Sequence, residues 1–218
     1  MMQRKGLDEN IEKLKNEMLL MGSQVEESIE QSIEALKNQD IELAEDVLEN
    51  DDKIDEYELE LEEMCTRLIA TQQPVAKDLR TIIVISKLAT DLERIGDHAC
   101  NIARMVINIG DEPLLKPLID IPRMTDIVTR RLKESLKAFV DFDVELAHEI
   151  AKEDEEVDVL DEQILRELLT FMIEDPKTIR QAMSLIFISR FLERIGDHAT
   201  NICERVIYMT TGDWDVSY

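Results

Sequence analysis

Aromatic residues and residues that break helices are scarce in this chain of 218 residues. Phe, Trp and Tyr make up only 4% of it, and there are 6 glycines and 5 prolines. Apolar residues nevertheless reach 44%, so the core must be packed mainly by aliphatic side chains. This composition favours a helical protein, and no stretch keeps the strict alternation that is typical of a strand.

Basic residues are the second shortage. Lys and Arg number 25 against 49 Asp and Glu, which gives a net charge of −24. Because nucleic acids are bound by basic surfaces, this charge argues against nucleic acid as a partner. It also argues against direct binding to an anionic membrane surface. An acidic surface does, however, attract cations.

Long apolar runs are also missing. Nothing approaches the roughly 20 consecutive apolar residues that cross a bilayer. The first residues lead into a charged amphipathic helix and not into the apolar stretch of a signal peptide. We therefore expect a cytoplasmic protein. Cys65, Cys100 and Cys203 are expected to be reduced, buried thiols.

Apolar residues recur at helical spacing along six long segments, which predicts an all-α fold. The plan repeats, because the run Asp143–Ala147 echoes Asp40–Ala44 at a distance of 103 residues. Asp40 is expected to cap the N-terminus of the second helix. Two similar three-helix bundles follow. Their predicted extents are residues 1–112 for the first unit, 117–211 for the second, and 212–218 for a tail to which we assign no role.

The most distinctive stretch, Leu92–Ile102, recurs as Leu192–Ile202 with ten of its eleven residues unchanged. Within it, Glu93, Asp97 and Asn101 follow one another at four-residue spacing. They therefore form a row on one side of a helix, away from the buried apolar stripe. Two carboxylates one turn apart repel each other by roughly 0.2–0.5 kcal/mol. The chain carries this unfavourable row on two helices.

Each copy of the stretch also carries a glycine in mid-helix, Gly96 and Gly196. Such a glycine costs about 1 kcal/mol relative to alanine. Its physical use is to let a neighbouring helix approach closely, and we expect that approach beside the acidic row.

Short turns near Pro74 and Pro176 make the helices on either side antiparallel, so residues equidistant from a turn face each other. Each turn brings an acidic row of the preceding helix opposite the acidic row of the repeated stretch. With helix axes about 8–10 Å apart, four carboxylates would converge, and hard oxygen ligands suit Mg²⁺, Mn²⁺, Ca²⁺ or iron. The candidate metal ligands are Asp51, Asp55, Glu93, Asp97 and Asn101 in the first unit, and Asp154, Asp158, Glu193, Asp197 and Asn201 in the second.

A reading without metal stays open. Among 49 acidic residues, pairs at four-residue spacing also arise by chance, as with Glu58 and Glu62. Such pairs can form a solvated face, and Arg94 or Arg194 can neutralise the aspartate three residues later. If a metal does bind, Glu155 is a competing ligand in the second unit.

His98 and His198 suggest metal ligands by residue type alone. On a helix they lie about 100° from the aspartates that precede them. We therefore expect packed histidines, or histidines that orient a ligand, and not ligands themselves.

The doubled Glu-Arg-Ile-Gly-Asp-His-Ala-x-Asn run, with an acid-x-x-x-Asp pair on the middle helix of each unit, resembles the PhoU family of phosphate-uptake regulators of bacteria and archaea. The resemblance covers nearly the whole chain. It implies surface metal clusters held by the acidic pairs, most simply multinuclear iron, with manganese, magnesium or zinc as alternatives. It also implies a cytoplasmic, non-enzymatic negative regulator that contacts the ATPase subunit of the phosphate transporter and the phosphate-sensing histidine kinase. Such a regulator reaches the membrane only through these partner proteins.

Two other functions stay open at this stage. The first is a helical enzyme with carboxylate-bridged metals, a hydrolase or a redox enzyme. Di-iron bundles build Glu-x-x-His ligand pairs that face the core, whereas the spacing here is Glu-x-x-x-Asp on an outward row. The second is a metal-free scaffold with acidic patches. Whether the chain forms a homodimer, and whether phosphate binds the metal, is also open.

Overall fold

The computed structural model describes the backbone of residues 2–213 and the side chains of residues 6–153 and 155–213. Residues 214–218 of the predicted tail and the side chain of Asp154 lie outside this description. Within it the chain is helical, and its helices are α1 (Met2–Asn38), α2 (Ile41–Gln72), α3 (Lys77–Ile109), α4 (Asp120–Asp141), α5 (Val144–Lys152), α6 (Asp154–Glu174), the 3₁₀ turn η1 (Pro176–Thr178) and α7 (Ile179–Thr211).

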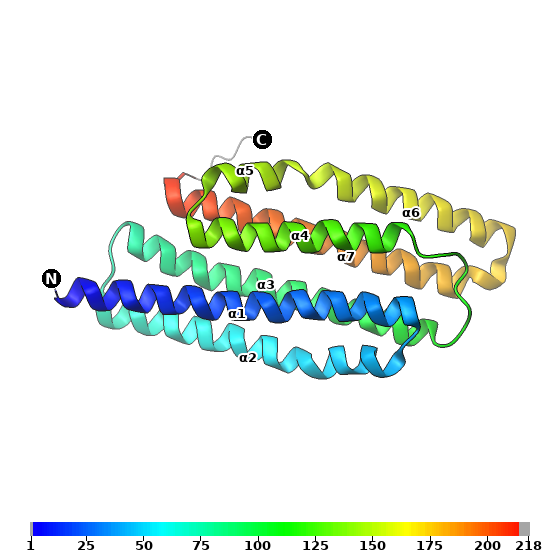
Figure 1. Ribbon diagram of the computed structural model, residues 1–218, viewed down its shortest axis with the longest axis horizontal. Helices are drawn as coiled ribbons and strands as arrows, with labels where there is room; N and C mark the ends of the chain where they lie inside the picture. The colour runs from blue at the N-terminus through cyan, green and yellow to red at the C-terminus, as the bar shows by residue number, and fades with distance from the viewer. Residues whose placement is uncertain (1, 214–218) are drawn as a thin grey trace.

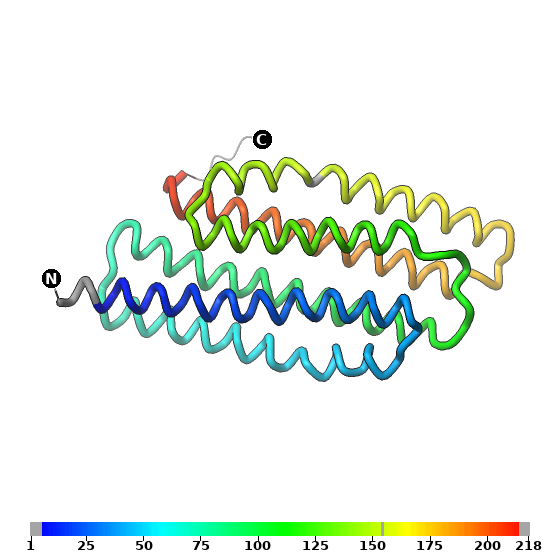
Figure 2. Tube along the Cα trace, in the orientation of Figure 1, coloured from blue at the N-terminus to red at the C-terminus, as the bar shows by residue number. Residues whose placement is uncertain are grey.

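The helices form two elongated bundles that lie side by side (Figure 1). Helices α1, α2 and α3 pack on one another, and α4, α5 and α6 pack around α7. The two units meet mainly along α3 and α7, which run antiparallel, with a smaller contact between α1 and α4. The tube in Figure 2 shows the α2–α3 turn and the α6–α7 turn at opposite ends of the molecule. The predicted all-α fold with two similar three-helix units is confirmed.

The predicted cap is present in both repeats. The carboxylate of Asp40 accepts a hydrogen bond from the backbone N–H of Leu43 at 3.0 Å, and Asp143 accepts one from Leu146 at 3.0 Å. Each bond satisfies one of the free N–H groups at a helix start. Pro122 lies in the first turn of α4, where a missing N–H costs little.

The fifth predicted helix is divided into α5 and α6 at Glu153. Four consecutive acidic residues, 153–156, occupy this position, and their mutual repulsion weakens a helix there. Glu153 is held by Arg130 of α4, whose guanidinium donates to its carboxylate at 2.7 Å. The interruption therefore falls where a contact with α4 replaces part of the helix's own stability.

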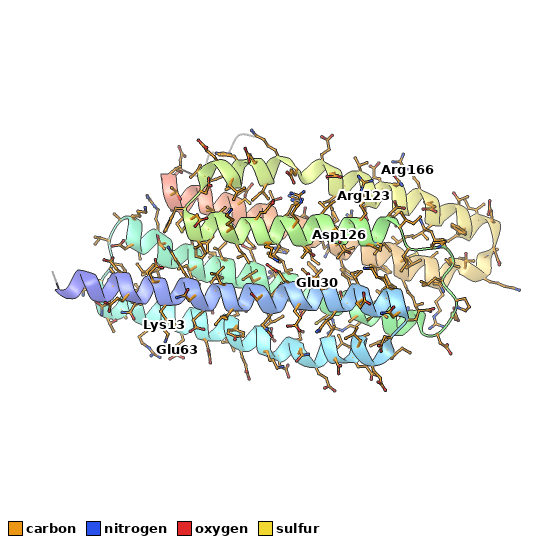
Figure 3. All side chains as sticks on the ribbon, in the orientation of Figure 1. Lys13, Glu30, Glu63, Arg123, Asp126 and Arg166 are labelled. Atoms are coloured by element: carbon orange, nitrogen blue, oxygen red, sulfur yellow. The ribbon has the colours of Figure 1, made fainter. Side chains whose placement is uncertain are left out.

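Aliphatic side chains fill the core, as the composition predicts. Cys65, Cys100 and Cys203 are buried and free, which confirms the expectation of buried thiols. Burial raises the pKa of Cys65 and of Cys203 to about 12. Charged side chains such as Glu63 on α2 and Arg166 on α6 cover the outer surface (Figure 3). None of the described helices is long and apolar enough to cross a membrane.

Candidate metal centres

The first unit brings five carboxylates together between α2 and α3. We call Asp51, Asp55, Glu58, Glu93 and Asp97 the first acidic cluster. Asp51 and Glu93 are half-buried, whereas Asp55 and Asp97 are exposed. The charges of Asp55 and Asp97 act on both Asp51 and Glu93, so the two rows do face each other across the hairpin, as the register predicts.

The electrostatic cost of this arrangement falls on Glu93. Burial, followed by the charges of Asp97, Glu58 and Asp55, raises the pKa of Glu93 to about 7. Burial also raises the pKa of Asp51 above its usual value, with Asp55 and Asp97 adding to the effect. Carboxylates that resist ionisation in this way gain from any cation that comes within reach.

The second unit repeats the arrangement between α6 and α7. We call Asp158, Asp161, Glu193 and Asp197 the second acidic cluster. Burial and then the charge of Asp197 raise the pKa of Glu193, and Asp161 and Asp158 raise it further. Asp154, which was also predicted as a ligand, lies outside the described side chains.

The second acidic cluster differs from the first because it contains an arginine. Arg190 of α7 donates to the Asp161 carboxylate at 3.1 Å and to Glu193 at 3.3 Å. Asp161 is buried and also accepts a hydrogen bond from the Ser189 hydroxyl at 2.7 Å. One hundred positions earlier the chain has Thr90 in place of Arg190, so the first cluster has no matching cation at this place.

The two asparagines at the ends of the acidic rows are half-buried. The Asn101 amide oxygen accepts a hydrogen bond from Arg104 at 2.8 Å, and the charge of Arg104 also acts on Asp51. Asn101 therefore lies beside the first acidic cluster, while its oxygen is already engaged. For Asn201 the role as a ligand stays a prediction.

The two glycines do permit close approach beside the acidic rows. A Cβ at Gly96 would lie 3.0 Å from Cδ1 of Ile54, and one at Gly196 would lie 3.3 Å from a guanidinium nitrogen of Arg131. The first contact lets α2 come close to α3, as predicted. The second accommodates a fully buried arginine of α4, which also donates to the Thr200 hydroxyl at 2.7 Å.

His98 and His198 lie at the contact between the two units and not in the acidic clusters. Their rings are 5.8 Å apart between centroids, and His98 stacks on Phe191 at 5.8 Å. Burial, then the neighbouring His198 and Arg194, lowers the pKa of His98 to about 4. His198 instead contacts the buried carboxylate of Asp91 at 3.1 Å. Packed histidines are what the sequence predicts.

Asp91 is also the acceptor for Arg205, whose Nε lies 2.6 Å from its Oδ2. Its side chain is only 6% exposed, so this ion pair connects α3 to α7 inside the molecule. In the second repeat, Phe191 occupies the place equivalent to Asp91. That phenylalanine is the signal in the sequence that could have identified position 91 as buried.

Glu58, Asp161 and Arg190 are the site residues that the sequence reasoning missed. The four-residue spacing of Glu58 and Glu62 is one that chance also produces in so acidic a chain. Glu58 and Asp161 are nevertheless 103 residues apart, which is the offset of the other acidic residues on α2 and α6. This shared offset is the signal in the sequence that could have identified Glu58 and Asp161 as site residues.

The donor sets suit hard cations, because carboxylate oxygens are the ligands such ions prefer. As the side chains lie, however, no three Asp, Glu, His or Cys among the described residues converge tightly enough to hold one ion. Binding at the first acidic cluster would therefore require its side chains to rotate inward. Asp55 and Asp97 are exposed, so their side chains have room to do so.

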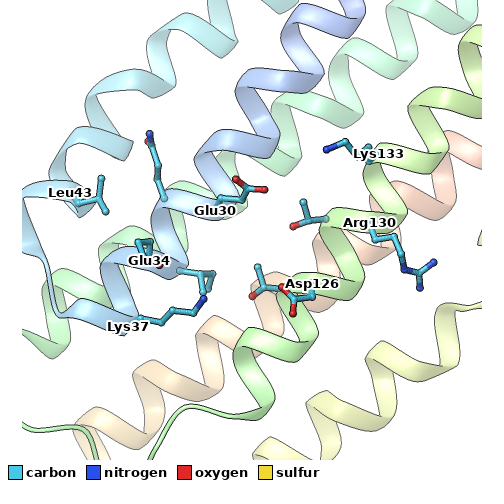
Figure 4. A pocket seen from close by; sticks show the side chains of 11 residues that line it. Glu30, Glu34, Lys37, Leu43, Asp126, Arg130 and Lys133 are labelled. Carbon is cyan, nitrogen blue, oxygen red and sulfur yellow. The ribbon is translucent and has the colours of Figure 1, made fainter.

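A separate groove of about 650 Å³ lies between α1 and α4 (Figure 4). Glu30 and Lys37 of α1 and Asp126, Arg130 and Lys133 of α4 are among its lining residues. Acidic and basic side chains are mixed along both walls, so the groove selects neither anions nor cations. The acidic clusters, by contrast, carry a net negative charge.

Comparisons with known proteins agree with this architecture. The PhoU domain matches the chain twice, over residues 18–106 and 121–206. The chain is 42% identical to a phosphate-specific transport system accessory protein PhoU homologue of Clostridium acetobutylicum, over 97% of both chains. It is 39% identical to the accessory protein PhoU of Escherichia coli, over 93% of this chain and 84% of that protein.

Two solved structures share the fold. The crystal structure of PhoU from Pseudomonas aeruginosa superposes with a TM-score of 0.90 at 40% identity, and it covers 94% of this chain and 99% of that one. The phosphate transport system regulatory protein PhoU from Streptococcus pneumoniae gives a TM-score of 0.90 at 30% identity, over 97% and 100%. The two domain matches, the identities and the shared fold show that this chain belongs to the PhoU family.

Proposed function

We propose that this protein is a cytoplasmic, non-enzymatic negative regulator of phosphate uptake that binds metal at its two acidic clusters. It contacts the ATPase subunit of a phosphate transporter and a phosphate-sensing histidine kinase. The relatives' names as accessory and regulatory proteins of phosphate transport support the role. Multinuclear iron is the proposed metal, with manganese, magnesium or zinc as alternatives.

One observation carries the metal-binding part of this proposal. Carboxylates of two antiparallel helices face each other at the same height in both hairpins, and in each cluster the central glutamate has a raised pKa. The first acidic cluster pairs Asp51 and Asp55 with Glu93 and Asp97. Repulsion of this kind is kept in two copies, which is expected if a cation offsets it.

A deletion strain tests the regulatory role. In phosphate-rich medium, cells without the gene are expected to take up phosphate severalfold faster than cells with it, because a negative regulator has been removed. Uptake of labelled phosphate is the measurement. Re-expression of the chain should restore the slow rate, and so should the surface variant Glu63→Ala. Equal uptake with and without the gene would rule out the regulatory role.

The arginine of the second acidic cluster gives a further prediction. Because Arg190 already neutralises Asp161 and Glu193, replacing it with threonine should tighten binding of Mn²⁺ to this cluster about tenfold, or about 1.4 kcal/mol. The variant is made in a chain that also carries Asp97→Ala, so that the measured binding of Mn²⁺ comes from the second acidic cluster alone. Isothermal titration calorimetry measures the affinity.

The control is Arg166→Thr, which removes the same charge from an exposed ion pair with Glu162 on α6. It should leave the affinity for Mn²⁺ within about twofold, since exposed pairs contribute little. An equal gain from Arg166→Thr and Arg190→Thr would mean that net charge, and not the position of Arg190, sets the affinity.

A further inference from the structure

His98 of α3 and His198 of α7 bring two imidazole rings together across the contact between the units. They are two of the three histidines in the chain, and they occupy the same place in the repeated stretch. Their ring centroids are 5.8 Å apart, and the ring planes are tilted by 38°. Both residues are half-buried, and 17% of the His198 side chain is exposed. Solvent and small ions can therefore reach the pair.

The separation of the two rings fits one shared metal ion. Two imidazoles that bind the same ion through nitrogens at about 2.0–2.1 Å have ring centroids roughly 5–6 Å apart in or near a tetrahedral arrangement. The observed 5.8 Å falls within this range. Binding then depends on the orientation of the rings, while the helices can stay in place.

His198 is held in the way that metal-binding histidines commonly are. Its Nδ1 lies 3.1 Å from Oδ1 of Asp91, and this carboxylate is buried and also accepts from Arg205. A carboxylate partner keeps the proton on Nδ1, so Nε2 carries the free lone pair. The same contact fixes the orientation of the ring and makes Nε2 a stronger ligand.

His98 has a nitrogen that is not satisfied by the protein. Its Nδ1 is buried and has no hydrogen-bond partner among the described residues, because Phe191 stacks on the ring where the other repeat has Asp91. A buried nitrogen without a partner costs free energy. Burial, then His198 and Arg194, lowers the pKa of His98 to about 4. The ring is therefore neutral at pH 7 and keeps a lone pair for a metal ion.

We propose that His98 and His198 bind one divalent ion of the zinc and copper class, which links α3 to α7 at the contact between the two units. Imidazole nitrogens suit such ions, whereas the carboxylates of the acidic clusters suit harder ones. No third Asp, Glu, His or Cys among the described residues converges on the pair, so water completes the coordination. This ion is separate from those proposed for the acidic clusters, and the inference does not rest on them.

The surroundings of the pair limit how tightly such an ion is held. Arg94 and Arg194 lie close enough for their charges to act on His98, and the charge of Asp97 acts on it in the opposite sense. The two arginines oppose a dication, and the protein supplies only two ligands. We therefore expect an affinity in the micromolar range.

Copper binding tests the ligands directly, because nitrogen ligands split the electron paramagnetic resonance signal of Cu²⁺ and carboxylate oxygens do not. One equivalent of CuSO₄ is added to the full chain in the presence of excess Mg²⁺, which competes for the acidic clusters. We expect coupling to two nitrogen nuclei in the wild type and in the control His148→Gln. His98→Gln and His198→Gln should each show coupling to at most one.

Isothermal titration calorimetry with Zn²⁺, under the same excess of Mg²⁺, measures the affinity. His98→Gln and His198→Gln should each weaken binding at least tenfold, whereas His148→Gln should change it by no more than about twofold. The double variant should bind little more weakly than either single one, since both histidines serve the same ion. Melting curves of the chelator-treated proteins establish that the variants are folded.

Three results would overturn the proposal. Loss of the nitrogen coupling in His148→Gln would assign the copper to that histidine. Additive losses of affinity from His98→Gln and His198→Gln would mean that the two residues do not share an ion. A wild-type spectrum without coupling to nitrogen would reduce the pair to packing between the units.

Discussion

Replacing Asp97 with alanine is expected to empty the first acidic cluster of metal and to leave the second occupied. Asp97 is exposed and faces Asp51 across the hairpin, so its loss removes one of the oxygen donors that an ion would draw together. Asp197→Ala should do the reverse. Elemental analysis of the purified proteins should show each variant with about the metal content of one cluster, and anomalous diffraction should locate the ions that remain.

Asp126→Ala is the control, because Asp126 is an exposed acid in the groove between α1 and α4. It should keep the full metal content. Loss of metal from both clusters in either single variant would contradict two independent sites. If neither Asp97→Ala nor Asp197→Ala loses metal, the ligands proposed here are wrong.

Asp91→Ala should cause the largest loss of stability. The carboxylate of Asp91 is buried and holds both Arg205 and His198 of α7, so its removal leaves a guanidinium inside the interface without its partner. Breaking a buried pair in this way costs about 3 kcal/mol. For a chain of this size, that corresponds to a fall in the melting temperature of about 6–12 °C, measurable by thermal denaturation followed by circular dichroism.

The comparison is with Glu63→Ala, which breaks the ion pair with Arg67 on the surface of α2. Both partners are about 70% exposed, and such pairs contribute roughly 0–1 kcal/mol. Its melting temperature should stay within about 4 °C of the wild type. A fall of similar size in Asp91→Ala and Glu63→Ala would show that the pair with Arg205 does not hold the two units together.

The architecture was predictable because each of its signals repeats. The same six segments are indicated by helical periodicity, by the capping aspartates Asp40 and Asp143, and by the two short turns. A fold can be predicted from its sequence when independent signals agree in this way. The break at Glu153 was not predictable in the same way. Its first-unit equivalent, Asn50, continues a helix, so the difference depends on the contact with Arg130 of α4.

The acidic clusters were predictable in outline and not in detail. The hairpin register placed Asp51 opposite Asp97 from counting alone, since two antiparallel helices leave little freedom. Arg190 was not found, because its role depends on the rotamer that carries its guanidinium to Asp161. The same holds for the pair of Asp91 and Arg205, which joins residues more than a hundred positions apart.

The unequal residues at positions 91 and 191 decide which halves can associate. Two first halves would present Asp91 to each other with Met105 where Arg205 belongs, and two second halves would bury Arg205 against Phe191. Either homotypic assembly leaves Asp91 or Arg205 without its partner at the contact between halves, whereas in the intact chain the two residues form an ion pair. The residues at these positions are therefore complementary between the two halves, and they would not be complementary between two copies of the same half.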